Sequence, residues 1–597
     1  MPDLLNEVEG LQEPEEKTIT KSAENIVKEI QEKDWEDERE HFSSRMFYLL
    51  AMTQICLSFH GIFACPLATL NHGGVFFFIP YTIFTFILGY PVHFLECSLG
   101  QYSQLGPMRV WDCVPLARGV GVASIFVSVV VAFYNNIYAT YAVMYLARCF
   151  DVVLPWTDCD VPFYKNKSCI PRMGSADPEH YTPAQHYFYD HILRTDFTEI
   201  IGHYVDGYVV WQQVLILFYV WFLIYLTMFQ SIKSLERMIP YLVGIALFCL
   251  LVLLSASIQI HGSFYALKMF FATSNFRHIC QMSTWHIAAQ LVLIELGIAQ
   301  GTLIAYGSYA HHRNKIQLTS KRIICFNYFI SVGSCFIVWF LMGSLYAEKK
   351  ESDSHSVQFH DFGYVFVLFT ETLGTIPGAR IWCICVFLLV VVSCLNSQIA
   401  IVHTLSCTFF DYFPHWEELK HILCLTLCFV FACVGISLCT TSSWILLQLF
   451  YEYPNSLARI PISAFTVGFI ILIYGMNKYC EDIHFIIDYY PSLVLRLLFY
   501  SAPFLMLGLS MTYWFLYSPF SQTNLVLFKI LFCLILISKL FGFAYWMVIS
   551  IKNQNFKNCW RSVDTWGPGN EKARIARTYF SSDSRVSFST PWNNPKS

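Results

Sequence analysis

The sequence predicts an all-α polytopic membrane protein with twelve transmembrane helices, and three observations support this fold class. Of its 597 residues, 55% are hydrophobic and only 13% are charged, which leaves too little polar surface for a soluble globule of this size. A hydrocarbon core needs about 20 apolar residues per helix, and twelve segments meet that requirement. The first and sixth segments, which correspond in two five-span halves, both carry helix-breaking residues, and this pairing predicts an inverted repeat. The predicted spans lie near 46–70, 75–98, 120–150, 210–228, 238–260, 285–309, 324–347, 381–410, 421–440, 456–476, 495–517 and 525–551.

Composition argues against several other classes of function. The net charge of −4 provides no basic surface for nucleic acid. The 22 cysteines are scattered mostly through apolar segments, where they are typical of small buried side chains rather than metal ligands. The sequence shows no phosphate-binding glycine loop, metal-spaced cluster or paired carboxylates outside the membrane, so we do not expect an enzyme. Two repeats of spans do not predict the ring of a channel either.

The spans divide the chain into three regions. Residues 1–44 are acidic and polar, contain no cleavable signal peptide, and are expected to form a disordered tail. Residues 45–551 form the membrane domain, and residues 552–597 form a short polar tail. Basic residues gather in alternate connections, which predicts that both tails are cytoplasmic and that the protein resides in the plasma membrane. These basic residues are Arg109, Arg118, Lys233, Arg237, Arg313, Lys315, Lys321 and Arg322.

The long connection at 151–207 is then expected outside the cell. It contains the stretch CDVPFYKNKSC, in which Cys159 and Cys169 are close enough to form a disulfide and Asn166 begins a glycosylation sequon. The alternative is two free thiols and an unmodified asparagine.

The two interrupted spans carry the candidate binding site. The first contains SFHGIFACPLATLNHGG at 58–74, and the sixth contains LIELGIAQGTLIAYGSY at 293–309 with Gly297, Gly301 and an acidic residue, Glu295. A break in mid-membrane is tolerated only where the freed backbone groups face protein, ligand or a water-filled cavity. For one broken span alone, a proline-kinked packing helix would be an adequate alternative, but two breaks in equivalent spans favour an inverted-repeat transporter with its site at mid-depth.

Seven motifs that follow one another from Trp35 to Pro568 resemble the neurotransmitter:sodium symporter family of sodium- and chloride-dependent solute carriers. They are the GG…F…IPY pattern at 73–81, LECSLGQYSQLGPMRVW at 95–111, PLARGVG from 115, LPWTDC from 154, Trp285 with GSY at 307–309, FTETLGTIP from 369 and YGMNKYCEDI from 474. The resemblance implies a LeuT-type fold and a divergent orphan member. It also implies a sodium-coupled symporter of a small amino-acid-like or neurotransmitter-like solute that works by alternating access. The alternative is a transport-incompetent relative that acts as a partner or regulator of another membrane protein.

The resemblance implies a substrate site at the two breaks. Its expected residues are Ser58, Phe59, His60, Tyr134, Asn135, Glu295, Leu296 and Gly297. Phe59 and His60 stand where the family has small residues, so they would fill space that a substrate occupies elsewhere. His60 has a plain alternative as a packing residue. The tyrosine that gates the substrate in the family maps to Asn135, with Tyr134 beside it.

Two sodium sites follow from the same resemblance. The first comprises Cys56, Gly61, Glu295 and Asn327, and the second comprises Gln54, Leu57, Ser393, Asn396 and Ser397. Gly61 replaces a sodium-binding asparagine, and Asn396 stands where an aspartate is common. Because a hard cation prefers anionic or carbonyl oxygen, we expect the second site to be weakened.

The family's anion site is altered as well. The resemblance places it at Tyr81, Glu295, Asn327 and Ser331, with Leu291 in place of a glutamine. The carboxylate of Glu295 could supply the negative charge that chloride otherwise provides, which predicts chloride-independent behaviour. The alternative is a protonated Glu295 that is hydrogen-bonded to a neighbour such as Asn327.

Two further features can be compared with the family: the charged pair of the outer gate, which is altered, and a glutamate of the second span, which is kept. The charged pair of the family's outer gate is replaced by Ala64 and Thr466, so no unpaired charge is left buried at these two positions. Glu96 matches a glutamate of the family and is expected to be structural.

Overall fold

A computed structural model describes residues 39–159, 182–194, 207–265, 276–312, 314–348, 361–441, 443–516 and 558–580, together with residues 169, 268, 270, 271, 274, 548 and 552. Within this part of the chain the secondary structure is helical apart from one isolated β-bridge between Val209 and Thr440. Nine helices are long and apolar enough to cross a membrane, and a bent pair of helices raises the number to ten. The sixth predicted span is divided into two helices, each too short for that criterion, and most of the twelfth lies outside the described residues. The count of twelve therefore stays a prediction.

The helices follow the predicted spans closely. The first span is α2 (Arg45–Cys56) and α3 (Phe59–Asn71), and the sixth is α12 (Met282–Glu295) and α13 (Thr302–Ser308). The second span combines η1 (Gly74–Phe77), α4 (Phe78–Phe84), the π-helical η2 (Thr85–Gly89) and α5 (Tyr90–Ser103). The other membrane helices are α6 (Arg118–Arg148), α9 (Trp211–Met228), α10 (Ile232–Gln259), α14 (Ile316–Glu348), α16 (Ala379–Tyr412), α17 (Lys420–Gly435) and α21 (Leu493–Leu516). The tenth span is α19 (Arg459–Gly468), η11 (Phe469–Gly475) and α20 (Met476–Ile487), preceded by α18 (Ser443–Glu452) and the π-helical η10 (Tyr453–Ala458).

Several basic residues that we assigned to connections lie inside helices instead. Lys233 and Arg237 belong to the first turns of α10, and Lys321 and Arg322 belong to α14. The physical reason is that these helices continue past the apolar segment that defined each predicted span, so that their charged first turns extend beyond it.

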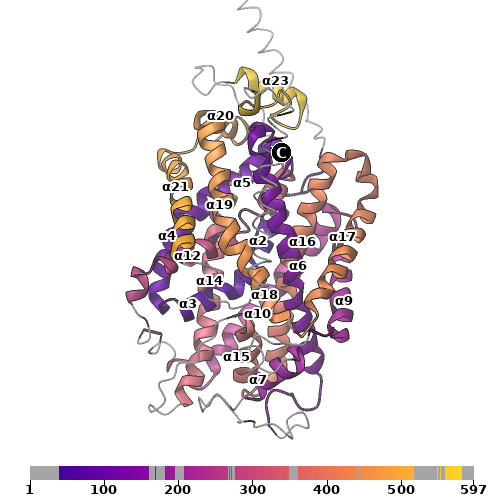
Figure 1. The fold of residues 1–597 in the computed structure, drawn as a ribbon, viewed down its shortest axis with the longest axis vertical. Coiled ribbons are helices and arrows are strands. Elements are labelled where there is room, and N and C mark those ends of the chain that lie inside the picture. Colours follow the sequence, from indigo (N-terminus) through magenta and orange to yellow (C-terminus); the bar gives the residue numbers. More distant parts are fainter. Residues whose placement is uncertain are drawn as a thin grey trace, which may run out of the picture.

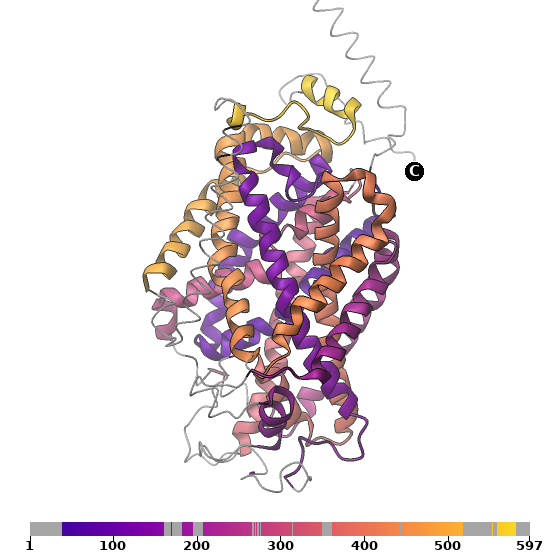
Figure 2. The same ribbon diagram turned by 45° about the vertical axis from the view of Figure 1, so that its right-hand side comes forward.

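Packing places α6 and α16 against each other in the middle of the bundle (Figures 1 and 2). α13 packs along α5, α14 packs along α3, and α19 packs along α21. Two glycines allow the first of these contacts, because a Cβ at Gly100 would lie 2.2 Å from the carbonyl oxygen of Ile304 and one at Gly307 would lie 2.5 Å from that of Cys97. α5 and α13 therefore meet backbone to backbone.

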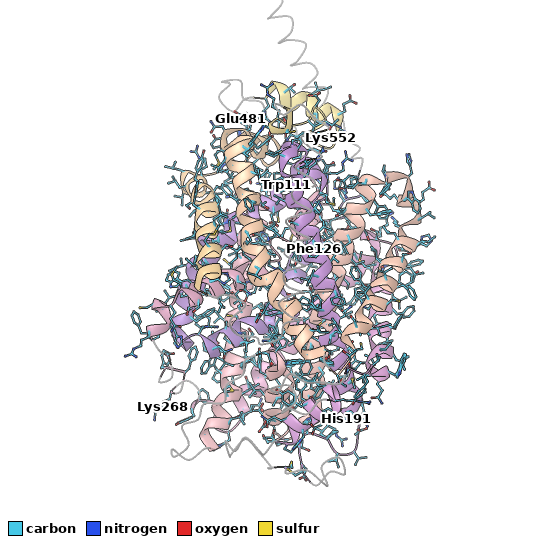
Figure 3. The ribbon with its side chains drawn as sticks, viewed as in Figure 1. Trp111, Phe126, His191, Lys268, Glu481 and Lys552 are labelled. Carbon is cyan, nitrogen blue, oxygen red and sulfur yellow. A yellow bond between two sulfur atoms is a disulfide. The ribbon has the colours of Figure 1, made fainter. Side chains whose placement is uncertain are left out.

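The two ends of the bundle differ. One end carries α20 and the C-terminal α23 (Glu571–Tyr579), and α7 (Pro183–His186) and α15 (Gly363–Leu373) lie toward the other (Figure 1). Figure 3 shows Glu481 and Lys552 at the first end and His191 at the second. The predicted disulfide is present between Cys159 and Cys169, whereas Asn166 lies outside the described residues.

Parts of both predicted tails pack against the bundle. Residues 39–44 fall in the tail that we expected to be disordered, yet Phe42 is only 3% exposed and its N–H donates to the carbonyl of Tyr309. Near the other terminus, Arg577 donates to Asp482 at 2.7 Å and the Trp566 side chain donates to the hydroxyl of Tyr474. A few aromatic and charged residues provide these contacts within segments whose overall composition is polar.

Candidate substrate and ion site

The helix breaks occur at or beside the predicted serine and glycine residues, whereas Pro66, which we also expected to mark the break, lies inside α3. α2 ends at Cys56, α3 begins at Phe59 with an axis turned by 42°, and the Ser58 hydroxyl accepts a hydrogen bond from the N–H of Gly61. A Cβ at Gly61 would lie 2.1 Å from the carbonyl oxygen of Cys56. Glycine is required here because the backbone before the break approaches it too closely for any side chain, including the asparagine of the family.

The break in the sixth span occupies residues 296–301. Gly297, Ala299 and Gly301 have φ values of 66°, 61° and 77°, and this left-handed conformation ends the helical hydrogen bonding. A Cβ at Gly297 would lie 2.6 Å from the side chain of Ile55 near the end of α2. The two breaks therefore face each other inside the bundle.

Glu295, the last residue of α12, accepts three hydrogen bonds on one carboxylate oxygen. Its Oε2 accepts from the hydroxyl of Tyr81 at 2.6 Å, from the amide of Asn327 at 2.8 Å and from the hydroxyl of Ser331 at 2.9 Å. All four residues are buried. The structure thus gathers the residues predicted for the anion site around the oxygen of a carboxylate. The other oxygen of Glu295, Oε1, has no hydrogen-bond partner among the residues that the structure describes.

The residues predicted to bind sodium meet in three pairs, two at the first break and one between α12 and α14. Cys56 contacts Gly61, Glu295 contacts Asn327, and the amide of Asn396 on α16 donates to the carbonyl of Leu57 at 3.3 Å. Ser393 donates within its own helix to Val390, and Ser397 is half-buried on α16. Four side-chain oxygens of the predicted set are buried without a hydrogen-bond partner, which suits ligands for a hard cation. These are Oε1 of Gln54, Oε1 of Glu295, Oδ1 of Asn327 and Oδ1 of Asn396.

The space beside the first break is filled by an aromatic cluster. We use this name for Phe59, His60, Tyr134, Tyr138, Phe362 and Tyr451. Phe59 is fully buried and stacks on Tyr138 with ring centres 4.4 Å apart. The ring of His60 stacks on Tyr451 at 5.1 Å. Among the described residues, its Nε2 has no hydrogen-bond partner. His60 therefore packs within the cluster, and Leu296, also buried, belongs to the turn on the facing span.

Tyr134 and Asn135 are adjacent on α6, but their side chains contact different parts of the bundle. Tyr134 lies against His60 and Tyr451 and accepts a hydrogen bond from Asn455 at 3.4 Å. Asn135 donates to the carbonyl of Cys394 on α16 at 3.4 Å. Of these two predicted residues, Tyr134 is the one that belongs to the cluster. Tyr138, Phe362 and Tyr451 were missed by sequence reasoning, because they lie in three separate segments.

A pocket adjoins the aromatic cluster and has a volume of about 60 Å³, enough for a few water-sized molecules. Its wall contains aromatic and acidic side chains from α6, α18 and the segment before α15. The lining residues are Leu67, Tyr138, Asp361, Phe362, Trp444, Leu447, Gln448, Tyr451 and Glu452.

The altered gate positions do not take part in this pocket. Thr466 on α19 donates to the carbonyl of Ile462 one turn earlier in its own helix, and Ala64 is buried in α3. Among the pocket-lining residues, α3 contributes Leu67, and α18 contributes the acidic side chain of Glu452.

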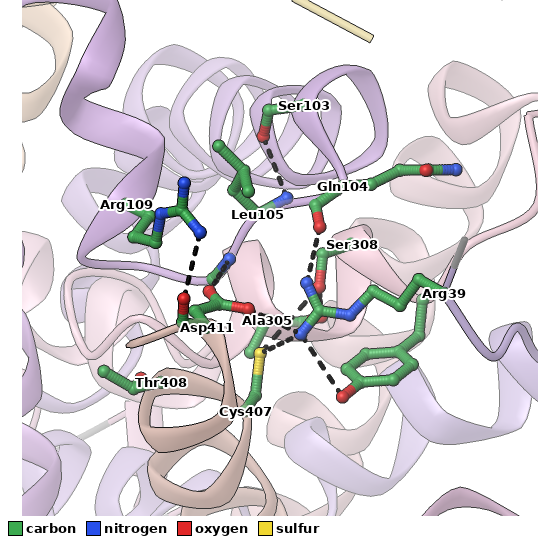
Figure 4. Close-up of polar contacts among 12 residues, drawn as sticks. Arg39, Ser103, Gln104, Leu105, Arg109, Ala305, Ser308, Cys407, Thr408 and Asp411 are labelled. Atoms are coloured by element: carbon green, nitrogen blue, oxygen red, sulfur yellow. Dashed lines mark hydrogen bonds and ion pairs between the residues drawn. The ribbon is translucent and has the colours of Figure 1, made fainter. Parts of the chain in front are cut away.

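The end of the bundle that carries α20 and α23 is closed by an Arg39 network, which consists of Arg39, Gln104, Tyr309, Cys407 and Asp411 (Figure 4). Arg39 forms an ion pair with Asp411 at 3.2 Å, and its guanidinium carbon lies 4.3 Å from the ring centre of Tyr309. It also donates to the carbonyl of Gln104 and to the thiol of Cys407. The network joins the segment before α2 to the ends of α5, α13 and α16. Sequence reasoning missed it because Arg39 was assigned to the tail.

Long apolar helices, two of which are broken around buried polar groups, define the class of protein: a multi-pass membrane protein. The profile of the Sodium:neurotransmitter symporter family matches residues 39–555. The chain therefore belongs to the sodium:neurotransmitter symporter family.

Three relatives illustrate the range of this similarity. The sodium- and chloride-dependent neutral and basic amino acid transporter B(0+) of Mus musculus is 28% identical over 497 residues, which cover 79% of this chain and 77% of the relative. The sodium- and chloride-dependent glycine transporter 2 of Xenopus laevis is 24% identical over 498 residues, or 77% of this chain and 62% of the relative. The sodium- and chloride-dependent GABA transporter ine of Drosophila melanogaster is 24% identical over 468 residues, which cover 77% of this chain and 49% of the relative.

Proposed function

We propose that this protein is a sodium-coupled symporter of a small amino-acid-like solute, working by alternating access and without a requirement for chloride. The family and its relatives support transport of small solutes with sodium. The proposed independence from chloride is based on the side chain of Glu295, which accepts hydrogen bonds from Tyr81, Asn327 and Ser331. A fixed negative charge at this position would replace the charge of a bound anion.

In this proposal sodium is a substrate that the protein transports together with the solute. Among the described residues, one side-chain oxygen each of Gln54, Asn327 and Asn396 is buried without a hydrogen-bond partner, and oxygen is the ligand that a hard cation prefers. The second site has an amide at Asn396 instead of a carboxylate, so we expect it to bind sodium weakly.

The solute would lie between the breaks, next to the aromatic cluster. Phe59 and His60 fill this region, with exposed fractions of 0% and 3%. A solute must therefore be small, or the cluster must rearrange before it binds. Movement of the first and sixth spans against α6 and α16 would then open one end of the bundle at a time, with the termini and the Arg39 network on the cytoplasmic side.

The same packing favours a second candidate function. A relative that does not transport could keep the fold, fill the solute site with Phe59 and His60, and act as a partner or regulator of another membrane protein. Surface expression without uptake or current would support this alternative.

The test is a screen of uptake and current across small amino acids in cells that express the protein at their surface. Replacement of sodium is expected to abolish the signal, and replacement of chloride by gluconate is expected to leave it unchanged. Removing the carboxylate in Glu295→Ser should create a requirement for chloride, because the three donors would then face a mobile anion. Glu452→Gln, which removes a carboxylate from the pocket wall, is the matched control and should leave the chloride response unchanged. A wild-type signal that needs chloride, or a Glu295→Ser variant that remains indifferent to it, would contradict the role of Glu295.

A further inference from the structure

A buried arginine, Arg459, lies at the first turn of α19 and is only 2% exposed. Its Nη1 donates to the carbonyl of Ile298 at 2.8 Å, its Nη2 donates to the side chain of Gln300 at 2.9 Å, and its Nε donates to Asn455 at 2.9 Å. Among the described residues, no carboxylate forms an ion pair with it. Ionisable groups inside a membrane are costly and are therefore candidates for function.

The contacts of Arg459 converge on one peptide group of the broken sixth span. While Arg459 donates to the carbonyl of Ile298, Glu96 on α5 accepts from the N–H of Ala299 at 3.1 Å. These two backbone groups belong to the same peptide unit. An acidic side chain that accepts at the N–H end and a guanidinium that donates at the C=O end match the direction of the peptide dipole, and the hydrogen bond from the guanidinium is charge-assisted. We call Glu96, this peptide and Arg459 the peptide bridge.

The peptide bridge holds a conformation that is unfavourable by itself. Ala299 has a φ of 61°, and a left-handed conformation is unfavourable for a non-glycine residue. Such a conformation persists only where the surroundings enforce it, and it often marks a functional segment. Here the side chains of Glu96 and Arg459 fix the N–H of Ala299 and the carbonyl before it.

The peptide bridge also connects two parts of the bundle. Glu96 lies on α5, which packs backbone to backbone with α13, so these helices form a unit with the turn between α12 and α13. Arg459 belongs to α19, outside that unit, and reaches the turn through Ile298 and Gln300. α13 leads directly from the turn to Tyr309 of the Arg39 network. The position of the turn is thus coupled to the closed end of the bundle.

We propose that Arg459 is a positioning residue of the transport cycle: by binding Ile298 and Gln300 it holds the turn of the sixth span, and with it α13, so that the end at the Arg39 network stays closed. The π-helical η10 directly before α19 supports this role, because π-helical turns are frequent at functional sites and this one places Asn455 beside Arg459. This proposal rests on the proposed function in one respect: it takes the closed end to be part of the path that the solute follows.

The native thiol of Cys407 provides a measurement that does not require transport. It is fully buried within the Arg39 network, so its rate of alkylation by N-ethylmaleimide reports how often this end opens. Peptide mass spectrometry of full-length protein labelled in membranes gives this rate relative to the exposed Cys280. Cys383, buried near the other end of α16, must stay unlabelled if the fold is intact.

Two substitutions at Gln300 are expected to act in opposite directions. Gln300→Leu removes the acceptor of Arg459 and should raise the alkylation rate of Cys407 about tenfold, the effect of one charge-assisted hydrogen bond. Gln300→Glu places a carboxylate opposite the guanidinium and should lower the rate by about threefold or more. Arg459→Gln should resemble Gln300→Leu. Ser463→Ala, which truncates a buried serine one turn further along α19 whose hydroxyl has no partner, is the matched control and should leave the rate unchanged.

The outcomes separate this proposal from the proposed function. Opposite shifts in the two Gln300 variants support the positioning role, whether or not uptake is detected. Equal rates in both variants, or shifts in the same direction, would overturn it even if the protein transports. If Arg459→Gln exposes Cys383 and therefore unfolds, the Gln300→Glu variant alone decides the outcome: a lower rate supports the role, and an unchanged or higher rate overturns it.

Discussion

Replacing Arg39 by alanine is expected to open the end of the bundle that carries α20 and α23. The Arg39 side chain joins Gln104, Tyr309, Cys407 and Asp411, which come from the ends of α5, α13 and α16 (Figure 4). Removing it leaves the carboxylate of Asp411 without its ion pair and removes the cation above the ring of Tyr309. The substitution removes these interactions from the closed conformation. We expect an open conformation to lack them already, so the substitution should destabilise only the closed form.

The size of the effect follows from burial. The side chains of Arg39 and Asp411 are 15% and 8% exposed, so the pair is mostly but not fully buried. Breaking a buried pair costs about 3–5 kcal/mol, and partial exposure to solvent lowers this figure. A cost of about 2 kcal/mol shifts the ratio of open to closed forms roughly 30-fold.

The assay is the alkylation rate of Cys407 relative to Cys280, measured as described above. Arg39→Ala should raise this rate by roughly the same 30-fold factor if opening is fast compared with labelling. Arg148→Ala is the matched control: it breaks an ion pair with Asp151 whose side chains are 41% and 42% exposed, and exposed pairs contribute little. If Cys407 labels no faster in Arg39→Ala than in Arg148→Ala, the Arg39 network does not close this end.

Two further predictions concern the first break. Gly61→Ala places a Cβ 2.1 Å from the carbonyl oxygen of Cys56 and should lower the melting temperature of the purified protein, whereas Gly333→Ala, with no atom within 4 Å of its new Cβ, should keep or raise it. Equal responses would show that the backbone at Gly61 adjusts freely. Phe59→Ala removes a fully buried ring of the aromatic cluster and should destabilise the protein by about 3 kcal/mol, and small amino acids should then raise the melting temperature of the variant more than that of the wild type. Phe329→Ala, at a position that is 73% exposed, should show neither effect.

Much of the fold was predictable because local chemistry determines it. The structure breaks the first span at Leu57 and Ser58, where Ser58 caps the next helix by accepting from the N–H of Gly61, and Pro66 lies inside that helix. Gly297 and Gly301 adopt the left-handed conformation that few other residues tolerate. The contact of Glu295 with Asn327 was also expected, although from the family resemblance rather than from local chemistry.

Other parts of the site could not be predicted from local sequence. Arg459 was one residue within the predicted tenth span, and only the folded chain shows that it reaches the turn at Ile298. The aromatic cluster joins His60 to Tyr451, and the Arg39 network joins the N-terminal segment to α16.

The sequence by itself therefore determined the membrane setting, the positions of the spans that the structure describes and the places where two of them break, because hydrophobicity, chain length and helix-breaking residues act over neighbouring positions. Only the tertiary structure decided which side chains fill the breaks, which charges hold the peptide between Ile298 and Ala299, and how one end of the bundle is closed. Those contacts join segments separated by hundreds of residues, and the free energy of burying a charge or an aromatic ring depends on the groups that folding brings around it.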